Sequence, residues 1–213
     1  MQKATIGILL LIIISFMIGI YYYPQMPEQM DSHWNASGEA DDSMSRFWGI
    51  FLMPIILVGM FVLFSIIPLI DPLKNNIKKF RKHFDGFIWF ISLFLFYIYI
   101  LTMLWNLGHN FNMTRFIIPA IGLMFFFAGI LIENAKMNWF IGIRTPWTLS
   151  SKNVWNKTHK LGGKLFKIAG ILAIIGLFFP EEIIIFSIVP VLIFTVYLFV
   201  YSYMKYKKEK NSK

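Results

Sequence analysis

The chain has 213 residues, of which 57% are hydrophobic and 18% aromatic, and it carries a net charge of +9. This composition places most of the chain in a membrane and excludes a separate soluble domain. Cysteine is absent, so disulfides and thiolate chemistry are excluded as well. The positive charge does not indicate direct nucleic-acid binding, because its distribution along the chain follows a membrane topology.

Six apolar runs have about the length that a membrane-spanning helix needs. A hydrocarbon core of ~30 Å requires about 20 apolar helical residues, and about 17 are enough. The runs are Ala4–Tyr23, Phe47–Ile70, Gly86–Asn106, Phe116–Ile132, Leu165–Phe179 and Ile183–Met204. The fifth run is short, and residues 161–163 can extend it. We therefore predict an all-α, polytopic protein of the cell membrane with six transmembrane helices.

The basic residues predict the orientation of these helices. Eighteen of the twenty Lys and Arg residues lie on one side, and only Arg46 and Arg115 lie on the other. Basic residues in short loops stay cytoplasmic, so both termini are expected inside. The acidic residues favour the outside: Glu28, Asp31, Glu39, Asp41, Asp42, Glu181 and Glu182. We predict a two-helix segment 1–70 with an acidic outer loop and a four-helix segment 71–213 with a basic inner loop 134–164, together one compact membrane domain.

None of the predicted spans carries an ionisable residue near its middle. Because such residues usually mark ion or proton pathways, their absence weighs against an ion-coupled transporter. Pro54 and Pro190 are expected to kink the second and sixth spans. In the fifth span, small residues share one helix face: Gly162, Ala169, Ala173 and Gly176. This face predicts close packing within the chain, with a dimer interface as the alternative.

The first outer loop, Pro24–Ser45, is polar and acidic, with turns expected at Pro27 and Gly38. It carries the cluster His33-Trp34-Asn35, which is a candidate for binding a ligand or partner. A metal site formed by His33 with Asp31 and His109 is an alternative, since imidazole and carboxylate groups suit zinc. Two histidines without a defined spacing are weak evidence, so no metal site is predicted.

The longest inner connection contains three tryptophans within seventeen residues, Trp139, Trp147 and Trp155. Tryptophan beside a membrane is typical of the headgroup level. Thr145-Pro146 predicts an extended residue before the proline, and Ser150 or Ser151 is expected to cap the helix that enters the fifth span. On that helix Trp155 and His159 are i, i+4 neighbours, and another face carries basic residues: Lys157, Lys160 and Lys164.

The run Gly142–Leu149 (GIRTPWTL), followed by Val154-Trp155, resembles the signature of the SdpI family. The outer loop resembles the small membrane domain of unknown function that often precedes this signature, through Pro27, His33-Trp34-Asn35, Gly38 and Pro54. This resemblance implies a non-enzymatic membrane protein that gives immunity to a secreted killing peptide of the SdpC type. In some members it also implies a sensor that holds a small helix-turn-helix repressor at the membrane.

The candidate ligand- or partner-binding residues come from these two motifs: Arg144, Thr145, Pro146, Trp147, Thr148, Trp155, His159, His33, Trp34 and Asn35. Each also has a structural alternative. The tryptophans would be interfacial anchors, Arg144 would bind lipid phosphate or stack on tryptophan, and His159 would be a hydrogen-bonding interfacial residue. No catalytic motif is present, so no catalytic residue and no cofactor are predicted.

Immunity to a secreted peptide toxin is therefore the leading functional hypothesis, with a cytoplasmic repressor and membrane lipids as further partners. A carrier or scramblase for a lipid or a small amphipathic molecule is the alternative. Kinked, uncharged and aromatic helices would suit such an apolar substrate better than an ion.

Overall fold

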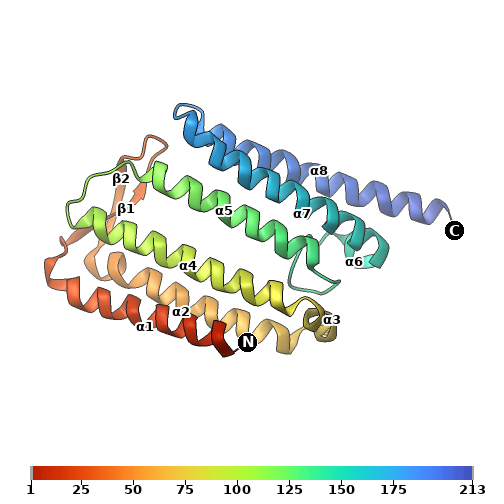
Figure 1. Ribbon diagram of the computed structural model, residues 1–213, viewed down its shortest axis with the longest axis horizontal. Coiled ribbons are helices and arrows are strands. Elements are labelled where there is room, and N and C mark those ends of the chain that lie inside the picture. The colour runs from red at the N-terminus through yellow and green to blue at the C-terminus, as the bar shows by residue number, and fades with distance from the viewer. Residues whose placement is uncertain (1, 213) are drawn as a thin grey trace. The chain divides into compact units, whose positions relative to one another are not determined.

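The computed structural model describes residues 2–212, with side chains from residue 4 onward, and is mostly helical (Figure 1). The helices are α1 (Gln2–Tyr22), α2 (Arg46–Ile70), α3 (Lys74–Lys79), α4 (Arg81–Asn106), α5 (Met113–Asn134), α6 (Pro146–Ser150), α7 (Lys152–Ile175) and α8 (Ile183–Asn211). Two short 3-10 helices, η1 (Tyr23–Gln25) and η2 (Gly176–Phe178), follow α1 and α7. The strands are β1 (Gln29–Trp34) and β2 (Ala40–Ser45).

Within residues 2–212, six helices are long and apolar enough to cross a membrane, which confirms the predicted six-span layout. They are Ala4–Gln25, Arg46–Ile70, Arg81–Asn106, Met113–Asn134, Lys152–Phe178 and Ile183–Asn211. Their exposed surfaces are rich in isoleucine, leucine, valine and phenylalanine. Such surfaces would be costly in water and are stable against lipid, so the chain is a multi-pass protein of the cell membrane.

The chain forms two compact units. The first consists of Met1–Phe64 and Ile88–Ala120, and the second consists of Ser65–Phe87 and Ile121–Lys213. The boundary between them passes through α2, α4 and α5. The division at residue 70 that the sequence indicates stays a prediction.

The first unit contains an element that the all-α prediction did not include. The loop after α1 forms an antiparallel hairpin of β1 and β2, in which Met30 pairs with Met44. Met30 is fully buried and packs with other buried residues: Met26, Ile50, Tyr99 and Met103. At the predicted turn Gly38 has a positive φ of 82°, and Asn35 closes the turn by backbone bonds with Glu39 and Gly38.

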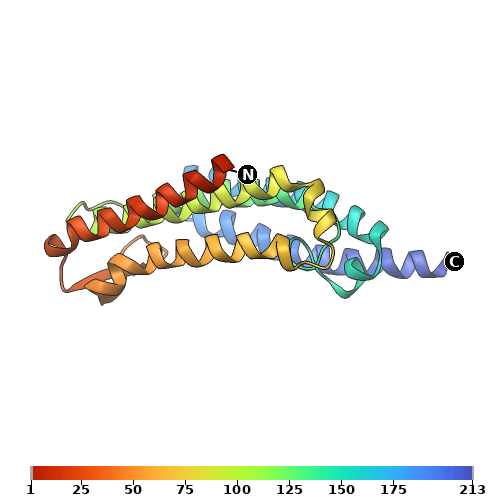
Figure 2. The same ribbon diagram turned by 90° about the horizontal axis from the view of Figure 1, so that it is seen from below.

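In the second unit α7 lies against α5 and α8. A Cβ atom at Gly129 would lie 2.7 Å from the carbonyl oxygen of Gly163, so α5 and α7 touch backbone to backbone there. The small face predicted for the fifth span is buried within the chain, at Gly162, Ala169, Ala173 and Gly176. In both views the last turns of α8 extend beyond α6 (Figures 1 and 2).

Helix α7 begins at Lys152, as the predicted serine cap implies, because the Ser151 hydroxyl accepts a hydrogen bond from the Val154 amide, at 3.2 Å, and so caps the helix. Ser150 does not cap this helix; its hydroxyl donates to the Pro146 carbonyl. Lys164 lies directly before the predicted fifth run Leu165–Phe179, and Lys167 lies near its beginning. Lys167 forms an ion pair with Glu133 of α5, at 2.6 Å, which offsets the cost of its burial.

Candidate functional site

The segment between α5 and α7 lacks regular structure from residue 135 to residue 145, and we call residues 135–151 the signature segment. The side chain of Asn138 is buried and holds this backbone from within. Its carbonyl oxygen accepts hydrogen bonds from the amides of Phe140 and Ile141, at 2.9 and 2.6 Å. Its amide nitrogen donates to the carbonyls of Lys136 and Ile141. One side chain thus satisfies four backbone groups of a segment that has no regular secondary structure to pair them.

Two residues far away in the sequence also fix the signature segment. Asp71, directly after α2, is buried, and its carboxylate accepts hydrogen bonds from the amides of Trp139 and Leu73, at 2.9 and 2.6 Å. Asn76 of α3 donates to the Met137 carbonyl, at 2.9 Å. The sequence analysis missed both residues. Asp71 stands out in the sequence as the acidic residue that ends an apolar span and precedes a basic connection.

His159 and Trp155 form the interior of this site. Their rings stack with centroids 3.8 Å apart and planes 15° apart. The Nε2 atom of His159 accepts a hydrogen bond from the Ile143 amide, at 3.0 Å, and Nδ1 donates to the Trp155 carbonyl, at 2.9 Å. Since one ring nitrogen accepts and the other donates, this imidazole is neutral.

Gly142 makes the bond between Ile143 and His159 possible. Its φ of +115° favours glycine, and a Cβ atom there would collide with Nε2 of His159. The indole nitrogen of Trp155 donates to the Ala135 carbonyl, at 2.9 Å, and the side chain has no exposed surface. Trp155 is therefore a core residue and not the interfacial anchor that the sequence indicated. His159 makes the expected hydrogen bonds, but inside the protein and not at its interface.

Thr145 and Thr148 shape the turn into α6. Thr145 has the extended conformation predicted before a proline, with φ −101° and ψ 160°. The two threonines form a reciprocal capping box, and Thr145 also bonds Ser202 of α8, at 3.1 Å. The Thr148 hydroxyl donates to the Ile143 carbonyl, at 2.8 Å. Burial favours the structural alternative for both threonines.

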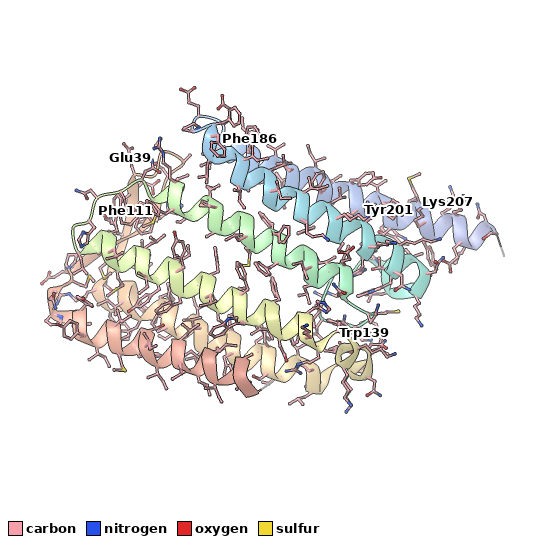
Figure 3. The ribbon with its side chains drawn as sticks, in the orientation of Figure 1. Glu39, Phe111, Trp139, Phe186, Tyr201 and Lys207 are labelled. Carbon is pink, nitrogen blue, oxygen red and sulfur yellow. The ribbon has the colours of Figure 1, made fainter. Side chains whose placement is uncertain are left out.

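Arg144 and Pro146 are the exposed members of the signature motif. Arg144 reaches back to the Trp139 carbonyl through one guanidinium nitrogen. Trp147 is half-buried against Phe199 and Tyr203 of α8, with ring centroids 4.9 and 5.1 Å away. Trp139 is 50% exposed in the loop before α6, where Figure 3 labels it. The signature segment therefore exposes Arg144 and Trp139 at its surface. The polar side chains that hold its backbone, Asn138 and Asp71, are buried, and we call them the buried frame.

The hairpin carries the second set of candidate residues. His33 is exposed and pairs with Asp41 on the opposite strand, at 2.5 Å. The Asn35 side chain accepts from the Glu39 amide, at 3.1 Å, and so stabilises the turn. Trp34 lies edge-on to Trp105 of α4, with centroids 5.8 Å apart, and its buried indole nitrogen has no hydrogen-bond partner among residues 2–212.

Asp31 fastens the hairpin to the end of α4. Its carboxylate accepts from the Trp105 indole nitrogen, at 2.8 Å, and its backbone exchanges two hydrogen bonds with the Asn106 side chain. His33 and Asp31 therefore have separate partners and do not form the metal site considered as an alternative. Within the described part of the chain, no three His, Asp or Glu side chains come together as metal ligands could.

Comparison with known proteins agrees with the motifs of both segments. Residues 134–202 match the sequence model of the SdpI/YfhL protein family, and residues 10–58 match a domain of unknown function, DUF1648. "Immunity protein SdpI" of Bacillus subtilis (strain 168) is 28% identical over 214 residues, which cover all of both chains. No solved structure matches the chain. The predicted family resemblance and the order of its two segments are confirmed.

Proposed function

Because residues 134–202 match the SdpI/YfhL family, we propose that the chain is a membrane immunity protein against a secreted antimicrobial peptide. The observation that carries this proposal is the relationship to an immunity protein over the whole of both chains. The match includes the hairpin as well as the signature segment, so it extends to both candidate surfaces. We treat the hairpin and the signature segment as two separate binding surfaces of one protein.

The orientation follows from the positive-inside rule. Eighteen of twenty basic residues fall on one side of the six spans, and translocating them would be costly. We place both termini and the signature segment in the cytoplasm and the hairpin outside the cell. The exposed carboxylates of the hairpin support this placement: Glu28, Glu39, Asp41 and Asp42.

The hairpin is the surface that a peptide arriving from outside would meet first. Its carboxylates would attract a cationic or amphipathic peptide, and attraction between opposite charges raises the association rate. Trp34 adds a partly exposed aromatic ring beside these carboxylates. Figure 3 shows Glu39 directed away from the hairpin. Binding here would sequester the peptide before it collapses the proton gradient across the membrane.

Survival of a sensitive strain that expresses the protein, under the cognate toxin, tests the function. We expect protection by the full chain and its loss in the variant E28Q/E39Q/D41N/D42N. The matched control is E181Q/E182Q, which removes exposed charge from the turn between η2 and α8. No protection despite verified membrane insertion would contradict the immunity function. Facilitated movement of labelled lipid in reconstituted vesicles would favour the carrier or scramblase instead.

A sensor role would use the other surface. We propose that Arg144 and Trp139 form the contact for a cytoplasmic helix-turn-helix repressor, because both are exposed and the Arg144 guanidinium bonds the Trp139 carbonyl, which holds the two residues together. Arginine offers planar, charge-assisted bonds to a carboxylate of such a partner. The variant R144Q should remain inserted and protective while membrane recruitment of the repressor falls. Parallel loss of protection and recruitment would contradict this role.

A further inference from the structure

Three lysines of α7 surround a groove that neither motif explains. The groove has a volume of about 230 Å³, opens to the surface and is lined by Lys157, Lys160, Leu161 and Lys164 of α7 and by Tyr201 of α8. Figure 3 labels Tyr201 where α8 runs beside α7. From this groove we infer that α7 and α8 form a binding site for the headgroup of an anionic phospholipid.

The charge of the groove is uncompensated by the protein itself. None of its lining residues is acidic, and Lys157, Lys160 and Lys164 form no ion pair within residues 2–212. The nearby carboxylates are engaged elsewhere: Glu133 pairs with Lys167, and Glu209 accepts hydrogen bonds from Ser151 and Asn153. Lys205 adds a further cation, with its amine 5.1 Å from the centre of the Tyr201 ring.

Lysines at these spacings repel one another. Lys157 and Lys160 are three residues apart and Lys160 and Lys164 four, which makes them neighbours on one helix face, and like charges so placed destabilise a helix. A single anionic group in the groove would relieve both repulsions. Three ammonium groups around one groove can donate hydrogen bonds to the oxygens of a phosphate.

The same face of α7 continues as an apolar surface. Ile168, Ile171 and Ile175 follow Lys164 at spacings of four, three and four residues, and they are 46%, 47% and 39% exposed. The face is therefore cationic in its first half and aliphatic in its second half. A phospholipid has the complementary distribution, a charged headgroup joined to acyl chains. Basic pockets between transmembrane helices are known to bind such headgroups.

A phospholipid fits this face better than a soluble anion or an acidic protein. Free phosphate would use the lysines but would leave the isoleucine surface unexplained. An acidic protein surface would match the three lysines but would leave the exposed isoleucines that follow Lys164 uncovered. The lysine stems can lie along apolar surface while their amines reach the headgroups.

The experiment measures lipid retained by the full-length protein in detergent by native mass spectrometry. Phosphatidylglycerol and phosphatidylcholine with identical acyl chains are the probes, and inorganic phosphate is the competitor. We expect at least tenfold preference for phosphatidylglycerol and no displacement by phosphate at equal concentration. The variant K157Q/K160Q/K164Q should lose this preference, and K157R/K160R/K164R should keep it.

The matched control is K207Q/K208Q/K210Q, which removes the same charge from the end of α8, where Figure 3 labels Lys207. Circular dichroism and gel filtration verify that each variant is folded. Equal loss in the groove and control variants would overturn the proposal, because the effect would then be diffuse charge. Equal binding of both lipids would overturn the proposal too and leave a protein surface as the partner of the groove. Displacement by free phosphate would also overturn it and assign the groove to a soluble anion.

Discussion

The hairpin and the signature segment contain similar residues and use them in opposite ways. In the hairpin, His33 is exposed and pairs with a carboxylate across two strands. In the signature segment, His159 is buried, neutral and bonded to two backbone groups. The Trp34 indole N–H has no partner among residues 2–212, whereas the Trp155 indole N–H donates to a carbonyl inside the core.

The difference follows from how each backbone is satisfied. A hairpin pairs its own amides and carbonyls, so its side chains are free to face outward. An irregular segment has no such ladder, so side chains must supply the missing partners, and those side chains have to be buried. A change in the hairpin should therefore affect function with little loss of stability, and a change in the buried frame should affect stability first.

The largest loss of stability is expected for Trp155→Ala. This substitution removes a fully buried side chain, its stacking on His159 and the bond to Ala135, so we expect a cost of about 3–5 kcal/mol. The midpoint of thermal unfolding in detergent measures the effect, and protection should fall in parallel. Trp139→Ala is the control, because this side chain is half exposed. A similar midpoint for both variants would contradict the core role of Trp155.

The substitution Asn138→Ala tests the polar frame directly. The amides of Phe140 and Ile141 would lose their acceptor, and one buried and one partly buried donor without partners should together cost about 2–3 kcal/mol. Faster hydrogen exchange at these two amides would accompany the lower unfolding temperature. Asn156→Ala, on the exposed side of α7, should show neither change. Unchanged exchange at residues 140 and 141 would mean that Asn138 does not hold the loop.

The helix contact that positions His159 and Trp155 can be tested at Gly163. The Cβ atom of alanine there would lie 2.7 Å from the Gly129 carbonyl oxygen and 2.5 Å from the Cβ atom of Glu133. Separating the helices should cost about 2 kcal/mol. Gly86→Ala in α4 is the matched control, since a Cβ atom has open space there, and it should stabilise the protein by about 0.5–1 kcal/mol. Equal effects of the two alanines would rule out close contact between α5 and α7.

The smallest effect on stability is expected for the pair His33→Ala and Asp41→Asn. Both side chains are exposed, and such pairs contribute little, so the unfolding free energy should change by no more than about 0.5 kcal/mol. Protection against the toxin should nevertheless fall for Asp41→Asn if the hairpin contacts a cationic peptide. A large drop in unfolding temperature would show that these hairpin side chains stabilise the fold as the buried side chains of the signature segment do. The contrast between the two regions would then be wrong.

The sequence by itself determined the six spans, the resemblance to the SdpI family and the extended residue before Pro146. These features depend on local properties: runs of apolar residues, a short motif, and the steric effect of a proline on the residue before it. The same local reasoning predicted Ser150 or Ser151 as the cap of α7, and in the structure Ser151 caps the helix.

Only the tertiary structure decided which candidate residues are buried and which are open. The bond from Trp139 to Asp71 joins residues 68 positions apart, and the bonds between Asp31 and Asn106 join residues 75 positions apart. A hydropathy pattern carries no information on such pairs, since a polar residue outside an apolar run can equally face water or a distant backbone amide. The structure buries Trp155, His159, Thr145 and Thr148, and it leaves Arg144 exposed on the signature segment and His33 exposed on the hairpin.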